Sequence, residues 1–158
     1  MVERARVCGA VTTEFENVPA ASLNQLAQTL PVAPAGSAVA IAQDRAAEKA
    51  HFVRCGVPVA PHAVIETPEQ LAAVPADLLP GILKTARMGY DGKGQVRVKT
   101  PAELAAAWDS VGKVPCVLEK MLPLQLECSV IVARGADGAM VHLPVQRNLH
   151  RDGILAVT

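Results

Sequence analysis

The sequence predicts a mixed α+β fold in which helices alternate with strands that pair mostly antiparallel. Two helix starts have the same form, because Thr67-Pro68 and Thr100-Pro101 are each followed by Gln or Glu at the third helical position. Asp137-Gly138, which lies between two apolar runs, is a hairpin turn signal. A chain of 158 residues with this pattern has room for one ordinary domain or two small ones.

The N-terminal part predicts one strand, one short helix and a linker. Val7 to Thr13 is an apolar stretch, Ser22 to Gln28 has helical periodicity, and two prolines and a glycine mark a linker over residues 30–37. A domain rarely begins in this way, so we expect the natural polypeptide to start before Met1.

Helices and strands then alternate to the end of the chain. A helix capped by Ser37 or Asp44 is expected to end before Gly56, and another is expected from Thr100 through Trp108. The expected strands are Val64–Ile65, Gly81–Thr85, Val96–Lys99, Cys116–Leu118, Leu126–Ala133, Met140–Val145 and Ile154–Thr158. The last strand has no cap or polar tail after it, which favours a natural chain that continues beyond Thr158.

Charge and hydropathy argue against two classes of partner. Lys plus Arg and Asp plus Glu both number 15, and a zero net charge is not typical of a general nucleic-acid binder. The longest uncharged run, Asn17 to Gln43, contains three prolines and several amide side chains, so it predicts no membrane-spanning helix.

The four cysteines, Cys8, Cys55, Cys116 and Cys128, include no Cys-x-x-Cys pair, so neither a zinc ribbon nor a redox dithiol is predicted. Cys116 and Cys128 lie in apolar runs and are expected to be small core residues. Reduced, buried thiols are typical of a cytosolic protein.

The strongest signal for chemistry is Lys84 followed by the glycine-rich segment Gly89 to Gln95. Glycines permit positive φ angles, and successive backbone N–H groups in such a loop can bind phosphate, with Lys84 and Lys93 adding charge. A strand follows the segment, so it is no Walker P-loop and is expected to fold over phosphates as a flap. We expect Gly92 and Gly94 to let the backbone come close to a phosphate, and we do not expect folding to require them. The alternative is an ordinary glycine-rich hairpin with solvated lysines.

Two further segments have features of a nucleotide site. The strand that ends in Glu119-Lys120 runs into Met121-Leu122, and an apolar slot with backbone groups at its edge suits an adenine. Glu127 is placed seven residues beyond Lys120, where its carboxylate could accept ribose hydroxyls. For Glu119 and Glu127 an exposed strand face is the alternative.

His150 lies in a polar segment, Gln146 to Gly153, between two expected strands. The segment could hold an anionic or heterocyclic substrate, although its spacing alone favours a solvated loop. His51, His62 and His142 have no partners at metal-ligand spacing and are expected to be structural or surface residues.

These motifs are preceded along the chain by Glu14 to Pro19 and by Asp44-Arg45 with Glu48-Lys49. Together and in this order, they closely resemble the 5-(carboxyamino)imidazole ribonucleotide synthases, a family of ATP-grasp enzymes of purine biosynthesis. The resemblance covers nearly the whole chain, and its specific parts are the segments Gly89 to Gln95 and Asn148 to Leu155. Lys84 and Glu119-Lys120 alone would fit many ATP-grasp enzymes.

The resemblance implies three parts of the chain. Residues 1–36 match the end of a pre-ATP-grasp domain and a linker, residues 37–120 an ATP-grasp lid domain, and residues 121–158 the start of a C-terminal ATP-grasp domain. The implied reaction carboxylates 5-aminoimidazole ribonucleotide with bicarbonate and ATP, through carboxyphosphate, in a cytoplasmic homodimer that uses Mg²⁺.

The resemblance also implies site residues. The matched nucleotide-contacting positions are Arg45, Lys84, Gly89, Tyr90, Asp91, Gly92, Lys93, Gly94, Gln95, Glu119, Lys120, Met121, Leu122, Glu127 and His150. Of these, Tyr90, Asp91 and Lys93 are also expected to meet the imidazole ribonucleotide during catalysis. No metal ligand is assigned, because the family's metal-binding carboxylates are not found in the sequence. The 158 residues alone are therefore expected to be inactive, and the open edge of the unfinished sheet at Ile154 to Thr158 is expected to make them prone to self-associate.

Two alternatives stay open. One is a relative on the same scaffold that uses formate or biotin, although Tyr90 to Lys93 and the His150 segment tell against it. The other is a non-enzymatic module that only binds a nucleotide.

Overall fold

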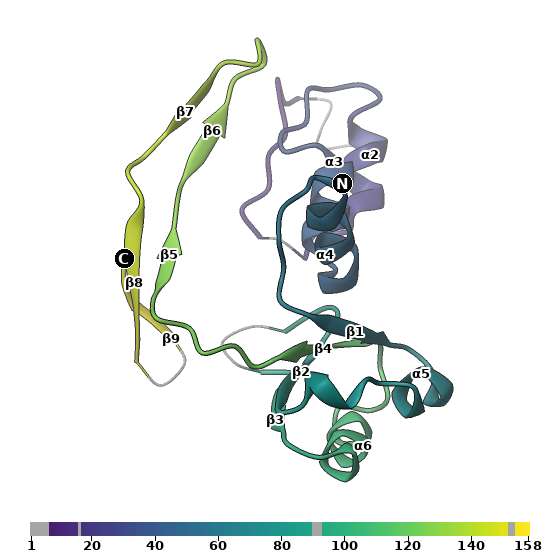
Figure 1. Cartoon of the computed structure of the whole chain (residues 1–158). Helices are drawn as coiled ribbons and strands as arrows, with labels where there is room; N and C mark the ends of the chain where they lie inside the picture. The colour runs from purple at the N-terminus through teal and green to yellow at the C-terminus, as the bar shows by residue number, and fades with distance from the viewer. Residues whose placement is uncertain (1–6, 16, 90–92, 152–153) are drawn as a thin grey trace. The chain divides into compact units, whose positions relative to one another are not determined.

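The structure is a computed structural model that describes residues 7–15, 17–89, 93–151 and 154–158 (Figure 1). The chain divides into two compact units. Residues 1–89 and 94–121 form the first unit, and residues 90–93 and 122–158 form the second. The mixed α+β architecture expected from the sequence is confirmed.

In the described part of the chain, the first unit begins with the helices α2 (Ala20–Leu26), α3 (Gly36–Ala42) and α4 (Arg45–Arg54). α2 packs against α3, and the contact buries Leu23, Leu26 and Val39. α4 begins after Asp44, whose carboxylate accepts the backbone N–H groups of Ala46 and Ala47. None of the helices in the described residues is long and apolar enough to span a bilayer.

The expected N-terminal strand is reduced to one parallel bridge between Val11 and Val32. Val32 belongs to the expected linker, whose end at Gly36 already begins α3. A bridge between two isolated residues forms only when tertiary structure brings them together. The pairing of Val11 with Val32 could therefore not be predicted from either segment alone.

A four-stranded antiparallel sheet forms the centre of the first unit, with strand order β1-β4-β2-β3. Its strands are β1 (His62–Ile65), β2 (Gly81–Thr85), β3 (Gln95–Val98) and β4 (Cys116–Lys120). β2 and β3 are the two arms of a hairpin around the glycine-rich segment, with Lys84 opposite Gln95.

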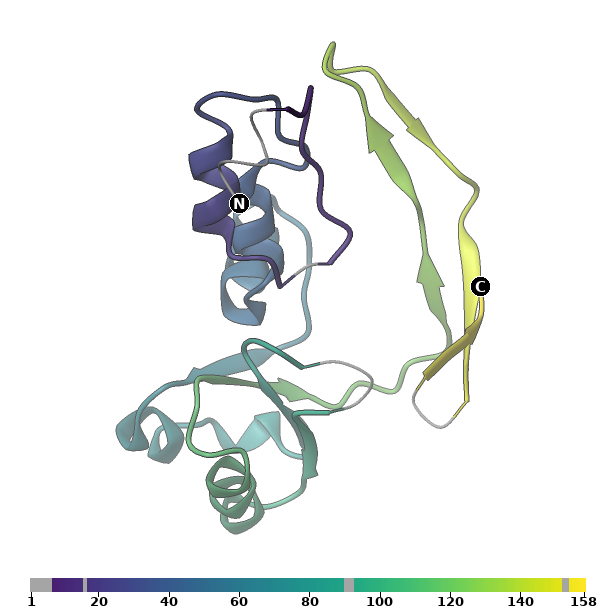
Figure 2. The same ribbon diagram turned by 180° about the vertical axis from the view of Figure 1, so that it is seen from behind.

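Two helices and a 3₁₀ turn, α5 (Pro68–Ala72), α6 (Pro101–Ser110) and η1 (Ala76–Leu78), lie on one face of this sheet (Figures 1 and 2). Within the described part of the chain, the core between these layers contains nine buried residues: Ile65, Leu78, Leu83, Val98, Leu104, Ala107, Trp108, Cys116 and Leu118. Trp108 also donates its indole N–H to the carbonyl of Val114, so its polar atom is satisfied inside the core.

Both expected Thr-Pro helix starts occur, but only one is a full capping box. At α5, Thr67 and Gln70 exchange side-chain and backbone hydrogen bonds in both directions. At α6, Thr100 accepts the N–H of Glu103, whereas the Glu103 carboxylate accepts the N–H of Lys99 instead of that of Thr100. The second helix start is therefore capped on one side only.

The second unit is built from short antiparallel strands. β5 (Glu127–Ser129), β8 (Gln146–Arg151) and β9 (Ile154–Val157) form one sheet, and β6 (Val132–Arg134) pairs with β7 (Met140–His142). The expected turn is present between β6 and β7, where Gly138 has a φ of 84° and Asp137 accepts the N–H of Ala139. Many apolar side chains of this unit are exposed, including those of Leu124, Val141, Val145 and Leu149.

The second unit corrects three expectations. Gln146 to Arg151 is strand β8 and not a solvated loop, because β5 and β9 pair with it on both sides. The expected strand Leu126–Ala133 is split into β5 and β6. Cys128 lies on β5 and is exposed, so its apolar neighbours did not predict burial correctly.

Core burial predicts a matched pair of valine substitutions. Val98 is 1% exposed and Val53 is 58% exposed. Val98→Ala removes two buried methyl groups, so we expect its free energy of unfolding to fall by about 1.5–3 kcal/mol. Val53→Ala is expected to change it by no more than about 0.5 kcal/mol. Urea titration followed by Trp108 fluorescence measures both, and equal losses would contradict the core described above.

The cysteines predict a reactivity contrast. Burial raises the pKa of the Cys116 thiol to about 11, whereas Cys8, Cys55 and Cys128 are exposed. Only a thiolate reacts with an aromatic disulfide reagent, so we expect three thiols to react in the folded chain at pH 8 and the Cys116 thiol to react after denaturation. Mass spectrometry of the labelled peptides identifies them, and rapid labelling of Cys116 in the folded chain would contradict its burial.

Candidate functional site

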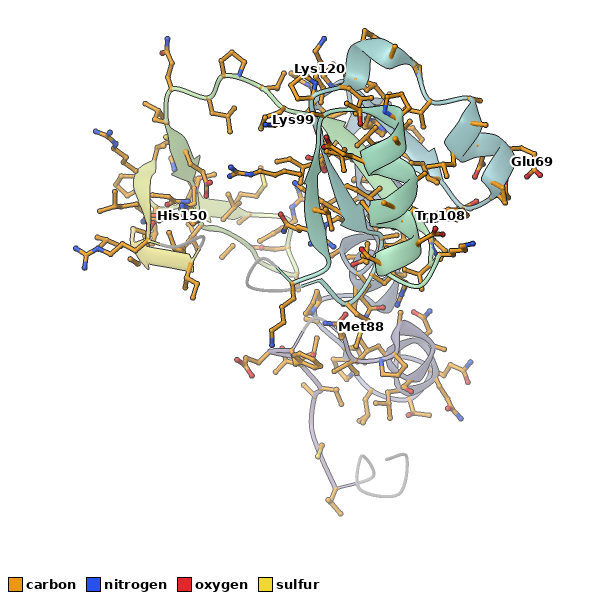
Figure 3. All side chains as sticks on the ribbon, turned by 90° about the horizontal axis from the view of Figure 1, so that it is seen from below. Glu69, Met88, Lys99, Trp108, Lys120 and His150 are labelled. Carbon is orange, nitrogen blue, oxygen red and sulfur yellow. The ribbon has the colours of Figure 1, made fainter. Side chains whose placement is uncertain are left out.

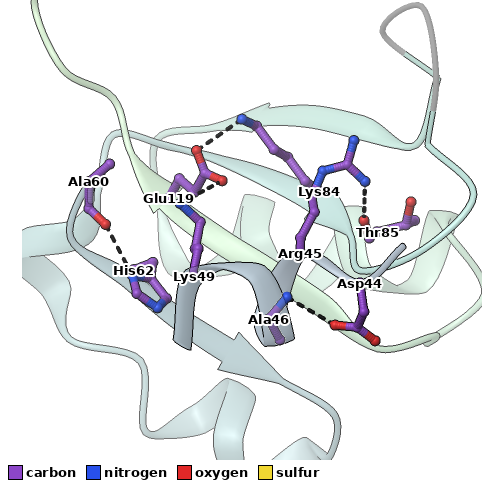
Figure 4. Close-up of polar contacts among 9 residues, drawn as sticks. All are labelled: Asp44, Arg45, Ala46, Lys49, Ala60, His62, Lys84, Thr85 and Glu119. Carbon is purple, nitrogen blue, oxygen red and sulfur yellow. Dashed lines mark hydrogen bonds and ion pairs between the residues drawn. The ribbon is translucent and has the colours of Figure 1, made fainter. Parts of the chain in front are cut away.

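Three charged side chains, Lys49, Lys84 and Glu119, form an ion-pair cluster on the face of the first unit's sheet opposite the core (Figure 4). Lys84 on β2 and Glu119 on β4 are diagonal neighbours, because Lys84 lies opposite Val117 and Ile82 lies opposite Glu119. Lys49 comes from α4. Its Nζ lies 3.1 Å from Glu119 Oε1, and Lys84 Nζ lies 2.9 Å from Glu119 Oε2.

This ion-pair cluster is largely withdrawn from solvent. The side chains of Lys49, Glu119 and Lys84 are 12%, 16% and 22% exposed. Burial by itself raises the pKa of the Glu119 carboxyl, but hydrogen bonds and charge from Lys84 and Lys49 outweigh it and hold the pKa below its usual value. Glu119 is therefore ionised at neutral pH, and the three groups together carry one net positive charge.

Arg45, at the first position of α4, contacts the segment that leads into the glycine-rich hairpin. Its guanidinium donates to the carbonyl of Thr85 at 2.7 Å and to that of Gly89 at 3.4 Å, and its backbone N–H donates to the carbonyl of Ala86 at 2.9 Å. The helix that supplies Lys49 to the ion-pair cluster therefore also fixes the start of the glycine-rich segment.

Gly94 closes the same hairpin and has a structural reason to be glycine. Its φ is +70°, and a Cβ there would lie 2.6 Å from Thr85 Oγ1. Its carbonyl accepts the N–H of Thr85. Gly94 is thus needed for local folding, contrary to the expectation that it serves only approach to a phosphate. Tyr90, Asp91 and Gly92 lie outside the described residues.

A polar pocket of about 200 Å³ adjoins Arg45. Gln43 lines it and is 6% exposed, with its side-chain amide donating to the carbonyl of Val18 and accepting from Arg87 at 3.0 Å. The other lining residues are Asn17, Ala42, Glu48, Ala86, Met88 and Gly89.

Lys120 is not brought together with Lys84. Side chains alternate along a strand, so Lys120 lies on the opposite face of β4 from Glu119. Figure 3 places Lys120 and Lys99 near the same end of the sheet, and Met88 lies at the other end. The N–H groups of Lys120 and Met121 donate to the carbonyls of Pro61 and Pro80, so neither is available to an adenine.

In the second unit, the structure brings Glu127 and His150 together. β5 pairs with β8 so that Glu127 lies opposite Asn148. Glu127 Oε1 accepts from the Asn148 amide at 3.2 Å and lies 3.5 Å from His150 Nε2. Both side chains keep exposed surface, 54% for Glu127 and 34% for His150. Two residues 23 positions apart thus form one polar patch with Asn148.

Lys49 is the site residue that the sequence prediction missed. A signal was present, since Arg45 and Lys49 are four residues apart on one helix and so lie on the same helix face. Among the described residues, no three His, Cys, Asp or Glu side chains are grouped so that they could hold a metal ion.

The chain is similar to N5-carboxyaminoimidazole ribonucleotide synthases from several bacteria. The N5-carboxyaminoimidazole ribonucleotide synthase of Pseudomonas aeruginosa is 40% identical over 149 residues, which are 94% of this chain and 41% of the relative. The Bacillus subtilis synthase is 34% identical over 96% of this chain and 40% of its own length. The chain thus spans about two fifths of the length of the curated relatives it matches.

Solved structures of related synthases have a similar fold over nearly the whole chain. The N5-carboxyaminoimidazole ribonucleotide synthetase from Thermus thermophilus has a TM-score of 0.85 at 36% identity, over 98% of this chain and 42% of that chain. An Aspergillus clavatus synthase in complex with ADP and 5-aminoimidazole ribonucleotide has a TM-score of 0.83 at 27% identity, over 96% and 39%.

Two family models divide the chain between them. The ribonucleotide synthetase preATP-grasp domain matches residues 1–43, and the ATP-grasp domain matches residues 50–158. The second match contains the ion-pair partners Lys84 and Glu119, the glycine-rich hairpin and the Glu127–His150 patch. The resemblance seen in the sequence is therefore confirmed, and the chain belongs to the ATP-grasp family.

Proposed function

We propose that the chain forms a nucleotide-binding part of an enzyme that carboxylates 5-aminoimidazole ribonucleotide with bicarbonate while ATP is converted to ADP and phosphate. The similarity to N5-carboxyaminoimidazole ribonucleotide synthases over nearly the whole chain supports this reaction. The Aspergillus clavatus relative binds ADP and 5-aminoimidazole ribonucleotide, which supports the choice of substrate.

The observation that carries the proposal is the ion-pair cluster beside the glycine-rich hairpin. Lys84 and Glu119 lie on one sheet face, and β2, the strand of Lys84, leads directly into the hairpin. One net positive charge that is withdrawn from water attracts a phosphate more strongly than a solvated lysine does. The alternative of an ordinary hairpin with solvated lysines does not account for the low exposure of Lys84.

The proposed chemistry has two displacement steps. A bicarbonate oxygen attacks the γ-phosphorus of ATP and ADP leaves, which yields carboxyphosphate. The exocyclic amine of the ribonucleotide then attacks the carbonyl carbon, phosphate leaves, and the nitrogen loses a proton. Lys84 stabilises the developing phosphate charge, and exclusion of water protects carboxyphosphate from hydrolysis.

The remaining sequence-predicted residues keep their proposed roles. Arg45 and residues Gly89 to Gln95 contact the nucleotide, and of these Tyr90, Asp91 and Lys93 also meet the ribonucleotide. The adenine lies against the backbone of Glu119 to Leu122, with the N–H groups of Lys120 and Met121 excepted. Glu127 accepts ribose hydroxyls and His150 contacts the nucleotide; their 3.5 Å approach supports a shared role.

Mg²⁺ is proposed as the counter-ion of the ATP phosphates. Among the described residues, no three His, Cys, Asp or Glu side chains are grouped for a metal ion, and no residue of this chain is proposed as a metal ligand. The family resemblance also supports a cytoplasmic homodimer, which is part of the proposal.

A chimera tests the proposed reaction. Residues 1–158 replace the matching segment of the Pseudomonas aeruginosa enzyme, and phosphate release is measured with ATP, bicarbonate and 5-aminoimidazole ribonucleotide. We expect release that depends on both bicarbonate and the ribonucleotide. A folded chimera that releases phosphate without either substrate, or not at all, would contradict the proposal.

Lys84→Met predicts weaker binding of ATP. The variant removes the ammonium that is proposed to contact a phosphate, so ATP affinity in the chimera should fall about 10- to 100-fold, or about 1.5–3 kcal/mol. Lys113→Met is the matched control, because Lys113 is 62% exposed and its ion pair is with Asp109, four residues earlier in the chain. Calorimetry measures both, and equal ATP affinity in the two variants would contradict the assignment of Lys84.

The close contact at Gly94 predicts that Gly94→Ala lowers the stability of the fold. The new Cβ clashes with Thr85, and a positive φ is strained for alanine, so we expect about 1–3 kcal/mol of lost stability. Gly112→Ala is the control, because Gly112 has a φ of +79° but open space around its Cβ position. Thr85→Ala combined with Gly94→Ala should recover part of the loss in urea titrations. No difference between the Gly94 and Gly112 variants would contradict the close contact.

A further inference from the structure

We propose that Lys49 is a positioning residue: by holding one oxygen of Glu119, it keeps the Lys84 ammonium available to an anionic ligand. The expected effect on ATP binding rests on the proposed nucleotide site. The physical basis of the inference is the pair of ion pairs that Glu119 forms with Lys49 and Lys84, all within one unit. Lys49 belongs to one of the motifs that carry the family resemblance, but neither the sequence nor the resemblance assigned it a role in the site.

Glu119 has two oxygens, and each is occupied by a different lysine. Oε1 faces Lys49 at 3.1 Å and Oε2 faces Lys84 at 2.9 Å. The pairing of Glu119 with Lys84 follows from strand register alone, because the two are diagonal neighbours on β4 and β2. Only Lys49 comes from outside the sheet, so the helix decides whether Lys84 has the carboxylate to itself.

The surroundings provide no equivalent substitute for Lys49 among the described residues. His62 lies opposite Glu119 in the register, but its Nδ1 contacts the carbonyl of Ala60 at 3.0 Å. Arg45, one turn earlier on α4, donates to the carbonyls of Thr85 and Gly89 instead (Figure 4). Within the described part of the chain, Glu119 forms its ion pairs with Lys49 and Lys84.

Removing the Lys49 charge should weaken the interaction of Lys84 with an anion in two ways. The net charge of the three groups falls from one positive charge to zero. The released Oε1 can also turn toward Lys84, and a carboxylate with one cationic partner holds that partner more tightly than a shared carboxylate does. The three side chains are mostly withdrawn from water, so neither change is fully screened. Lys84 should then exchange Glu119 for a phosphate less readily.

The first arm of the test needs no nucleotide. The full chain is treated with limiting acetic anhydride, and acetylation of Lys84 relative to Lys113 is measured by mass spectrometry. In Lys49→Met, the more tightly held ammonium should make Lys84 at least about threefold less reactive. Glu119→Gln should make Lys84 more reactive toward acetic anhydride. In the presence of Glu119→Gln, adding Lys49→Met should no longer lower the reactivity of Lys84. Lys49→Arg, which keeps the charge, should restore reactivity near that of the unchanged chain.

The second arm compares the binding of ATP with that of adenosine, measured by calorimetry with each variant placed in the chimera described above. Lys49→Met should weaken ATP at least about fivefold and leave adenosine unchanged, because adenosine carries no phosphate for Lys84. Lys113→Met is the charge-matched control and should change neither. A lysine that only ties α4 to the sheet would lower the melting temperature and leave both the Lys84 labelling ratio and the ATP-to-adenosine ratio unchanged.

The outcomes separate the two proposals. Unchanged Lys84 labelling in Lys49→Met, with the fold intact by Trp108 fluorescence, overturns the positioning role. Altered labelling together with no ATP binding by the unsubstituted chimera supports the positioning role and counts against the proposed nucleotide site. Equal weakening of ATP and adenosine in Lys49→Met, with unaltered labelling, assigns Lys49 to the fold alone.

Discussion

The antiparallel register between β2 and β4 is the constraint on which the rest of the first unit depends. It places Leu83 beside Leu118 on the core face and Lys84 beside Glu119 on the opposite face. A shift of one residue would exchange the two faces and would put charged side chains against Trp108. The same pairing therefore secures the core and assembles the charged site.

The charged face depends on helix α4 as well as on the sheet. Asp44 caps the helix, Arg45 contacts Thr85 and Gly89, and Lys49 pairs with Glu119. A partly buried ion pair costs desolvation energy, and removal of one partner leaves the other charge uncompensated. A carboxylate that is shared by two ammonium groups avoids an uncompensated negative charge and leaves a positive charge on the sheet face. Such an arrangement suits a site that receives a multiply charged anion.

In the second unit, a polar segment of the sequence forms the central strand of a sheet. β8 carries Arg147, Asn148, His150 and Arg151, yet it is paired on both sides by β5 and β9. The hydrogen bonds between paired strands are made by backbone groups, so polar side chains can project from a strand whose position the pairing fixes. Glu127, Asn148 and His150 meet in this way, and Ser129 and Thr158 both donate to the side-chain carbonyl oxygen of Asn148.

Local signals in the sequence determined the fold class, the Thr67 capping box, the Asp137-Gly138 turn, the central strands and the glycine-rich hairpin, because turn and cap chemistry act within four residues. The resemblance carried by the glycine-rich and His150 segments also led to the correct family. Tertiary structure alone decided that Lys49 reaches Glu119, that Lys120 lies on the other face from Lys84, that Gln146 to Arg151 is a strand, and that Cys128 is exposed. These outcomes depend on register, on strand partners and on which layer covers a face. Contacts between residues far apart in the chain fix all three, and no local pattern records them.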